Sequence, residues 1–99
     1  MARHYRTGHE LRARLEGQGL APLGDDLRFL LCCLERIPVE SHDKALERYV
    51  EAWQTGMERA SASAVQNTGR RTANTFVRRA LERRRIAVPD TDDMRQVRL

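Results

Sequence analysis

The sequence predicts an all-α protein, a compact bundle of about four helices in one domain. Apolar residues recur at spacings of three and four along most of the chain, which is the period of a helix. The chain has 99 residues and only five aromatic ones, so Leu, Val, Ala and Met must build the core, as in helical proteins. A chain of this length buries roughly 60–68% of its unfolded surface, which is enough for one modest core.

Two helices are expected in the first third of the chain. The first covers residues 7–16, with Thr7 as N-cap and Glu10 three residues later in a capping box. The second covers residues 26–37 and is capped by Asp25. Its apolar residues are spread around most of its circumference, which predicts that it lies at the centre of the bundle.

The longest predicted helix covers residues 42–66 and carries a heptad pattern. Its apolar positions are four, three, four, three and four residues apart: Leu46, Val50, Trp53, Met57, Ala60 and Ala64. This spacing favours lengthwise packing on another helix. Gly56 lies inside the pattern and predicts either close helix packing or a bend.

The same heptad seam has a second interpretation that concerns assembly. If the seam is longer than the helices available to cover it, a second copy of the chain would bury the rest. The interface of such a homodimer would contain Val50, Trp53 and Met57. We favour the interpretation that these residues belong to the core of one chain.

A basic helix is expected over residues 70–85, after a helix stop formed by Asn67, Thr68 and Gly69. Five apolar residues fall on one face of this helix: Ala73, Phe76, Val77, Ala80 and Leu81. The domain then ends near residue 88. Residues 89–99 are expected to form a tail that is either a short helix or disordered.

Charge is distributed unevenly along the chain. Residues 67–86 contain seven arginines and a single acid, Glu82. Of the eighteen basic residues, all but Lys44 are arginine. A GC-rich bacterial or phage genome explains the choice of arginine over lysine, but not the clustering. The clustering therefore predicts a polyanionic or acidic partner.

The leading functional prediction is a small bacterial or phage accessory protein that contacts nucleic acid, or a nucleic-acid–protein complex. Guanidinium groups pair with phosphates in bidentate fashion, and on this helix Arg71, Arg78 and Arg85 form one ridge. Asn74 and Thr75 lie on the polar side of this helix and could read base edges if the helix enters a major groove. The complete set of predicted contact residues is Arg70, Arg71, Asn74, Arg78, Arg79, Arg83 and Arg85.

Several alternatives remain open at this stage. The arginines could form only a solvated basic face, with or without ion pairs to Glu47, Glu51 and Glu58 of the preceding helix. They could instead dock on an acidic protein surface, as an inhibitor or assembly factor does. A structural helical oligomer is a third option. A helix-turn-helix with its turn at residues 67–69 fits poorly, because Thr75 and Arg78 would occupy buried positions.

No pattern indicates an enzyme, a cofactor or a metal site. The serines lack a nucleophile-elbow context, and phosphate-loop and dinucleotide motifs are missing. His4, His9 and His42 are scattered. The adjacent Cys32 and Cys33 are predicted to be small buried hydrophobic residues. Without a signal sequence or an apolar run near the roughly 20 residues that span a bilayer, a cytoplasmic protein without membrane contact is expected.

Overall fold

The structure, a computed structural model, describes residues 7–99, which form five α-helices and two short 3-10 turns. The helices are α1 (Gly8–Glu16), α2 (Gly24–Glu35), α3 (His42–Arg59), α4 (Val65–Arg83) and α5 (Thr91–Arg95), with 3-10 turns at Val39–Ser41 and Ala62–Ala64. Residues 7–99 contain no strand, so the predicted all-α class is confirmed.

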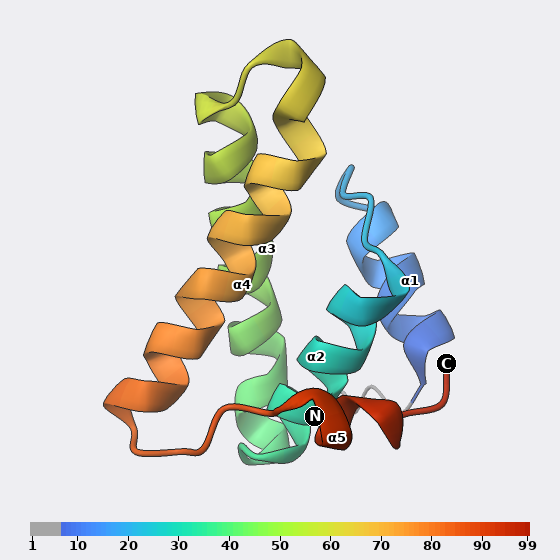
Figure 1. The fold of residues 1–99 in the computed structure, drawn as a ribbon, viewed down its shortest axis with the longest axis vertical. Coiled ribbons are helices and arrows are strands. Elements are labelled where there is room, and N and C mark those ends of the chain that lie inside the picture. Colours follow the sequence, from blue (N-terminus) through green and yellow to red (C-terminus); the bar gives the residue numbers. More distant parts are fainter. Residues whose placement is uncertain (1–6) are drawn as a thin grey trace.

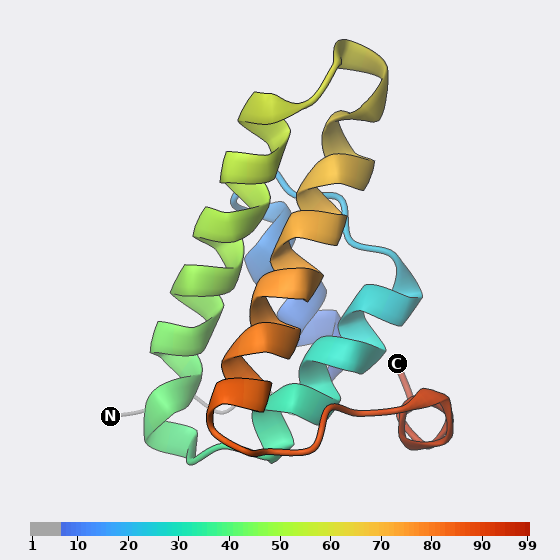
Figure 2. The same ribbon diagram turned by 60° about the vertical axis from the view of Figure 1, so that its left-hand side comes forward.

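Helices α3 and α4 form a long antiparallel hairpin, and α1 and α2 pack beside it (Figure 1). Turning the molecule shows that α2 lies against the hairpin (Figure 2). The ion pair between Arg36 and Asp93 joins α5 to the residue that follows α2. The largest fully buried side chains come from three of the helices, α1, α2 and α3: Leu11, Leu15, Leu27, Leu46, Tyr49, Trp53. Helix α4 has the most basic sequence of the five helices, and one of its sides is exposed to solvent.

The first two helices begin close to their predicted positions. The Glu10 backbone N–H donates to Thr7 Oγ1 at 3.2 Å, which confirms Thr7 as the N-cap of α1. For α2 the prediction of Asp25 as the cap was wrong. The helix starts at Gly24, and it is the Asp26 carboxylate that accepts from the Leu23 N–H at 2.8 Å. The helix ends at Glu35, two residues before the predicted end.

The prediction of one helix over residues 42–66 was wrong, because α3 ends at Arg59. Ala60 adopts an extended backbone with ψ of 154°, and the chain turns through Ser61 into the second 3-10 turn. Serines satisfy backbone groups with their own hydroxyls and so favour turns over helix interiors. The spacing of Ala60 and Ala64 continued the heptad pattern only in sequence, since neither residue belongs to α3.

The predicted stop at residues 67–69 was also wrong, because all three residues lie inside α4. The helix continues without interruption through Gly69, which leaves no turn for a helix-turn-helix at this place. The real end comes after Arg83, where Arg85 has a φ of +59°. The Ile86 N–H donates to Leu81 O at 3.0 Å, the bond typical of a Schellman motif.

The C-terminal tail contains the short helix α5 and packs on the domain. The Asp90 carboxylate accepts from the Asp93 N–H at 2.8 Å and caps α5. The Asp93 carboxylate accepts from the Asp90 N–H at 2.9 Å and pairs with Arg36 at 2.9 Å. These contacts hold the pKa of Asp93 below its usual value, with the backbone hydrogen bond contributing most. Met94 and Val97 add apolar contacts to the core.

Candidate nucleic-acid interface

Two glycines set the distance between α3 and α4. A Cβ on Gly56 would come within 2.9 Å of the Gly69 Cα and 2.6 Å of Thr72 Oγ1. A Cβ on Gly69 would lie 2.8 Å from the backbone oxygen of Trp53. Distances this short are steric clashes, so the two helices cross at a point where only glycine fits. Of the two expectations for Gly56, the structure shows close packing.

A buried polar network joins α2, α3 and α4 around Asp26. Besides the Leu23 N–H, the Asp26 carboxylate accepts from Arg70 Nε at 2.7 Å and from Asn74 Nδ2 at 3.0 Å. The Asn74 carbonyl in turn accepts from the Tyr49 hydroxyl at 2.8 Å. Burial raises the pKa of Tyr49 well above its ordinary value, and the negative charge of Asp26 adds to this effect. Both oxygens of the Asp26 carboxylate thus accept hydrogen bonds, as a buried charge requires.

Arg70 is a structural residue of this network. Its side chain is only 15% exposed, and its Nη2 donates to Ala21 O at 2.9 Å. Its Nη1 donates to Asn67 Oδ1 at 2.5 Å, and the guanidinium carbon lies 5.5 Å from the centre of the Trp53 ring. The polar groups of Arg70 and Asn74 are thus used inside the domain. Arg70 and Asn74 therefore have a structural role, unlike the one predicted for all seven contact residues.

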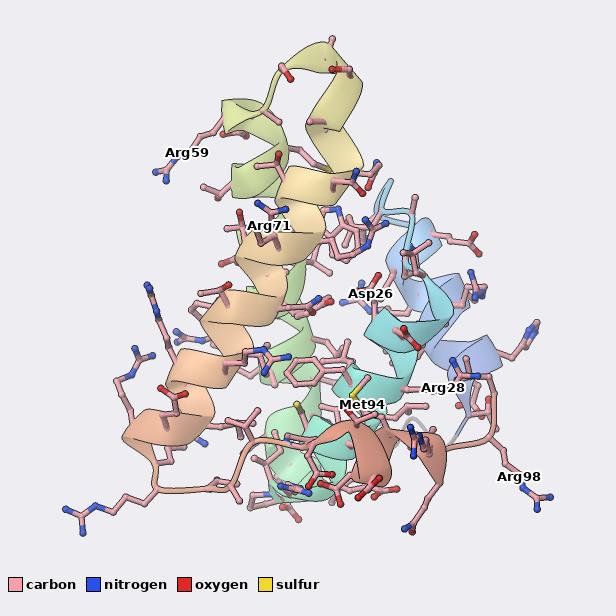
Figure 3. The ribbon with its side chains drawn as sticks, viewed as in Figure 1. Asp26, Arg28, Arg59, Arg71, Met94 and Arg98 are labelled. Carbon is pink, nitrogen blue, oxygen red and sulfur yellow. The ribbon has the colours of Figure 1, made fainter. Side chains whose placement is uncertain are left out.

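The remaining predicted arginines stay on the surface. The exposed arginines of the segment are Arg71, Arg78, Arg79, Arg83, Arg84 and Arg85. Within residues 7–99 none of them forms an ion pair. The guanidinium carbon of Arg78 lies 4.8 Å from the centre of the buried Phe29 ring, which orients the side chain while leaving its N–H groups in solvent. Figure 3 shows Arg71 on α4 and Asp26 on the neighbouring α2.

Some of these exposed arginines line a groove between α3 and α4. Arg71, Arg79 and Arg83 line it from α4, and Arg48 lines it from α3. The side chains of Thr55, Thr72 and Thr75 add hydroxyl groups, and the lining contains one acid, Glu51. Sequence reasoning missed Arg48. It lies seven residues before Thr55 on the exposed side of α3, but only the hairpin brings it beside the arginines of α4.

Acids of α3 do not neutralise the arginines of α4 in the described part of the chain. Of Glu47, Glu51 and Glu58, only Glu47 forms an ion pair within residues 7–99, and its partner is Lys44 of the same helix, at 4.0 Å. Glu51 lines the groove, but within residues 7–99 no arginine nitrogen lies within 4.0 Å of its carboxylate oxygens. The ion pairs considered for a solvated face are thus missing within residues 7–99, while the exposure of the arginines is the same for a solvated face and for a binding surface.

The residues considered for a dimer interface pack mainly inside the single chain. Trp53 is fully buried and Val50 is 5% exposed. Met57 is partly buried and packs against the same core cluster. The Trp53 Nε1 donates to Gln66 Oε1 at 2.9 Å, so its polar group is also satisfied within the chain. The core interpretation that the sequence favoured is the one that the structure shows.

The cysteines are buried free thiols. Burial raises the pKa of Cys33 to about 12, with the neighbouring Cys32 adding to the effect. Burial also raises the pKa of Cys32. No group of three or more His, Cys, Asp or Glu side chains within residues 7–99 could hold a metal ion, and His4 lies outside these residues.

The helices of the described chain include none with the length and apolar character needed to cross a membrane. Comparison with family models, with curated proteins and with solved structures found no match.

Proposed function

We propose that this protein binds nucleic acid through Arg71, Arg78, Arg79, Arg83 and Arg85, together with Arg48 of α3. We call these six residues the arginine surface. One observation carries the proposal: these guanidinium groups are exposed, and none is neutralised by an ion pair within residues 7–99. Free guanidiniums bind phosphate oxygens and displace condensed counterions, which is the main source of non-specific affinity for nucleic acid.

Arg85 belongs to the arginine surface although it lies beyond the last residue of α4. Its φ of +59° lies in the left-handed region, where glycine or asparagine is preferred. An arginine at this position costs roughly 1–2 kcal/mol relative to a relaxed conformation. The Schellman motif that ends α4 accounts for this conformation, and the exposed Arg85 side chain stays open to a phosphate contact.

Binding through this surface should have low sequence specificity. The amide of Asn74, which was predicted to read base edges, is hydrogen-bonded to Asp26 and Tyr49. The arginine surface itself offers mainly charge, which favours phosphate contacts. We therefore propose recognition of the backbone, with any specificity supplied by a partner or by nucleic-acid shape.

An acidic protein surface is the second candidate partner. The groove that holds Arg48, Arg71 and Arg79 also exposes apolar area from Ala52 and Phe76. Protein interfaces combine arginine with apolar and aromatic contacts in this way. The chain would then act as an inhibitor or assembly factor. A structural oligomer built on Val50 and Trp53 has less support, because both side chains are buried in the single chain.

Fluorescence anisotropy with labelled duplex DNA, single-stranded DNA and RNA tests the proposal. If all six residues contact phosphates, affinity for duplex DNA should fall about a thousandfold between 50 and 200 mM salt. The test variant is Arg71→Gln, Arg79→Gln, Arg83→Gln. The matched control is Arg59→Gln, Arg95→Gln, Arg98→Gln, which removes the same charge from exposed positions elsewhere.

Comparison of the two variants separates the effect of charge at the arginine surface from the effect of the net charge of the protein. We expect the test variant to lose binding and to show a smaller salt slope, while the control keeps most of its affinity. Circular dichroism and thermal unfolding check that both variants are folded. Equal losses in the two variants would indicate a general charge effect. Absence of binding to all three nucleic acids at 50 mM salt would reject the proposal and favour an acidic protein partner.

A further inference from the structure

A second site lies at the other end of the hairpin from the glycine crossing. In Figure 1 the ribbons of α3 and α4 cross in their upper part, and the C-terminal end of α4 lies well to one side of the start of α3. A cleft of about 390 Å³ lies between these two helix ends. Ala45 of α3 and Ala80 of α4 both line it. Because the helices have diverged at this level, two small side chains leave the space between them unfilled.

The interior of the cleft is apolar. Leu30 and Leu34 of α2 line it, together with Phe76 and Val77 of α4 and Ile37. Each leucine is 2% exposed, so these side chains belong to the core and hold the cleft walls in place. The volume lies in the range of small-molecule sites, which are about 300–1,000 Å³ and mostly apolar.

The polar side chains of the lining are basic, apart from the hydroxyl of Ser41 and the thiol of Cys33. The cations come from α3, from the last residue of α4 and from the residue that follows it: Lys44, Arg48, Arg83 and Arg84. The lining contains no acid. Lys44 has a distant partner, Glu47 at 4.0 Å, while the three arginines form no ion pair within residues 7–99. A ligand in this cleft would therefore meet an apolar interior and a positive rim.

We propose that the cleft binds a small anionic amphiphile, a free molecule with a compact apolar body and one carboxylate, sulfonate or phosphate group. The apolar body would displace water from the leucine-lined interior, which is favourable in proportion to the apolar area removed. The anionic group would accept charge-assisted hydrogen bonds from the rim. The rim shares Arg48 and Arg83 with the arginine surface, so the inference is tested at Lys44, Arg84 and Ala80, which do not line the groove and are not part of that surface.

A pair of fluorescent probes tests both parts of this chemistry. 1-Anilinonaphthalene-8-sulfonate has an apolar body and one sulfonate, and N-phenyl-1-naphthylamine has the same rings without the charge. We expect saturable binding of the sulfonate probe at one site per chain. The uncharged probe should bind roughly 10- to 150-fold more weakly, because it cannot accept the charge-assisted hydrogen bonds that the sulfonate accepts. Equal affinity for the two probes would overturn the proposal.

Variants of the cleft locate the probe. Ala80→Leu fills the space between the helices and should abolish sulfonate binding, whereas Ala80→Ser should preserve it. Lys44→Gln with Arg84→Gln should weaken it about tenfold. The matched pair Arg59→Gln with Arg98→Gln removes the same charge from other exposed positions and should leave affinity unchanged. Unchanged binding in folded Ala80→Leu, or equal losses in the two charge pairs, would overturn the proposal.

A measurement on the unmodified protein covers the case in which Ala80→Leu does not fold. Amide chemical shifts recorded with the sulfonate probe should change around Ala45, Ala80 and Ile37. They should stay constant around Arg59, at the far end of α3. Changes confined to other parts of the domain would overturn the proposal.

Discussion

Two regions of α4 use arginine in different ways. Near its N-terminus, Arg70 reaches a buried carboxylate, Asp26, and its side chain is 15% exposed. From Arg71 to the end of the helix, the arginines are exposed and have no ion pair within residues 7–99. Adjacent residues on a helix point about 100° apart, so Arg70 faces α2 while Arg71 faces solvent. The environment of each arginine, rather than its residue type, decides whether it stabilises the fold or is free to bind a partner.

The largest expected effect comes from exchanging Arg70 for Gln. Removing one member of a buried charge pair leaves the other without compensation and typically costs about 3–5 kcal/mol. Because Arg70 is slightly exposed, we expect about 3 kcal/mol, measured as the free energy of unfolding in urea. Arg71→Gln is the control for position and charge, and it should change stability by less than about 0.5 kcal/mol.

For nucleic-acid affinity we expect the reverse: Arg71→Gln should lose more affinity than Arg70→Gln. Folded Arg70→Gln, at a temperature well below its unfolding transition, should bind nearly as well as the wild type. Arg71→Gln should bind more weakly. If Arg71→Gln is the more destabilised protein, the distinction between the two regions of α4 is wrong.

The second effect concerns the glycine crossing. Alanine is favoured over glycine inside a helix by about 1 kcal/mol, so Gly69→Ala would stabilise α4 if the site had room. The added methyl group would instead clash with Trp53. We expect a net loss of about 1–3 kcal/mol, as for overpacked cores, measured by thermal or urea unfolding.

Gly24→Ala is the control for this substitution. Its added methyl group would meet mainly the end of the Arg28 side chain, at 3.1 Å, and this side chain can move. We expect little change or a small gain in stability. A gain in Gly69→Ala of the same size would show that the two helices do not need a glycine at their crossing.

The smallest expected effect is a pH dependence of stability at alkaline pH. The pKa of Cys33 is raised from 9.0 to about 12 in the folded protein. The folded state therefore keeps its proton where the unfolded state has lost it. The free energy of unfolding should fall as pH rises from about 9 toward 12. Tyr49, whose pKa is also raised by burial, should contribute in the same direction.

Urea unfolding at pH 7, 9 and 10 measures this slope. The Cys33→Ala variant lacks the thiol and should lose less stability over the same range, although its stability at pH 7 is lower because of the cavity. Equal slopes in the two proteins would mean that Cys33 does not contribute through its ionisation. Arginines remain charged at all three pH values, so the arginine surface should not affect the comparison.

The errors in the predicted helices have a common cause. The heptad spacing through Ala60 and Ala64 looked continuous because small apolar residues suit both a helix seam and a tight connection. Gly69 looked like a helix stop because glycine is common at helix ends. In the structure it is needed for close approach to Trp53. In each case the residue type allowed two local structures, and the packing of α3 on α4 selected one.

The sequence by itself determined the all-α class, the N-cap at Thr7 and the concentration of arginine in one helix. These properties follow from local periodicity and composition, which act within a few residues. Only the tertiary structure decided which arginines are free and where the cleft lies. The partner of Arg70 is 44 residues away along the chain, and Arg48 joins the arginine surface only because the hairpin brings α3 beside α4. No local pattern records such long-range contacts, because they depend on how the helices pack.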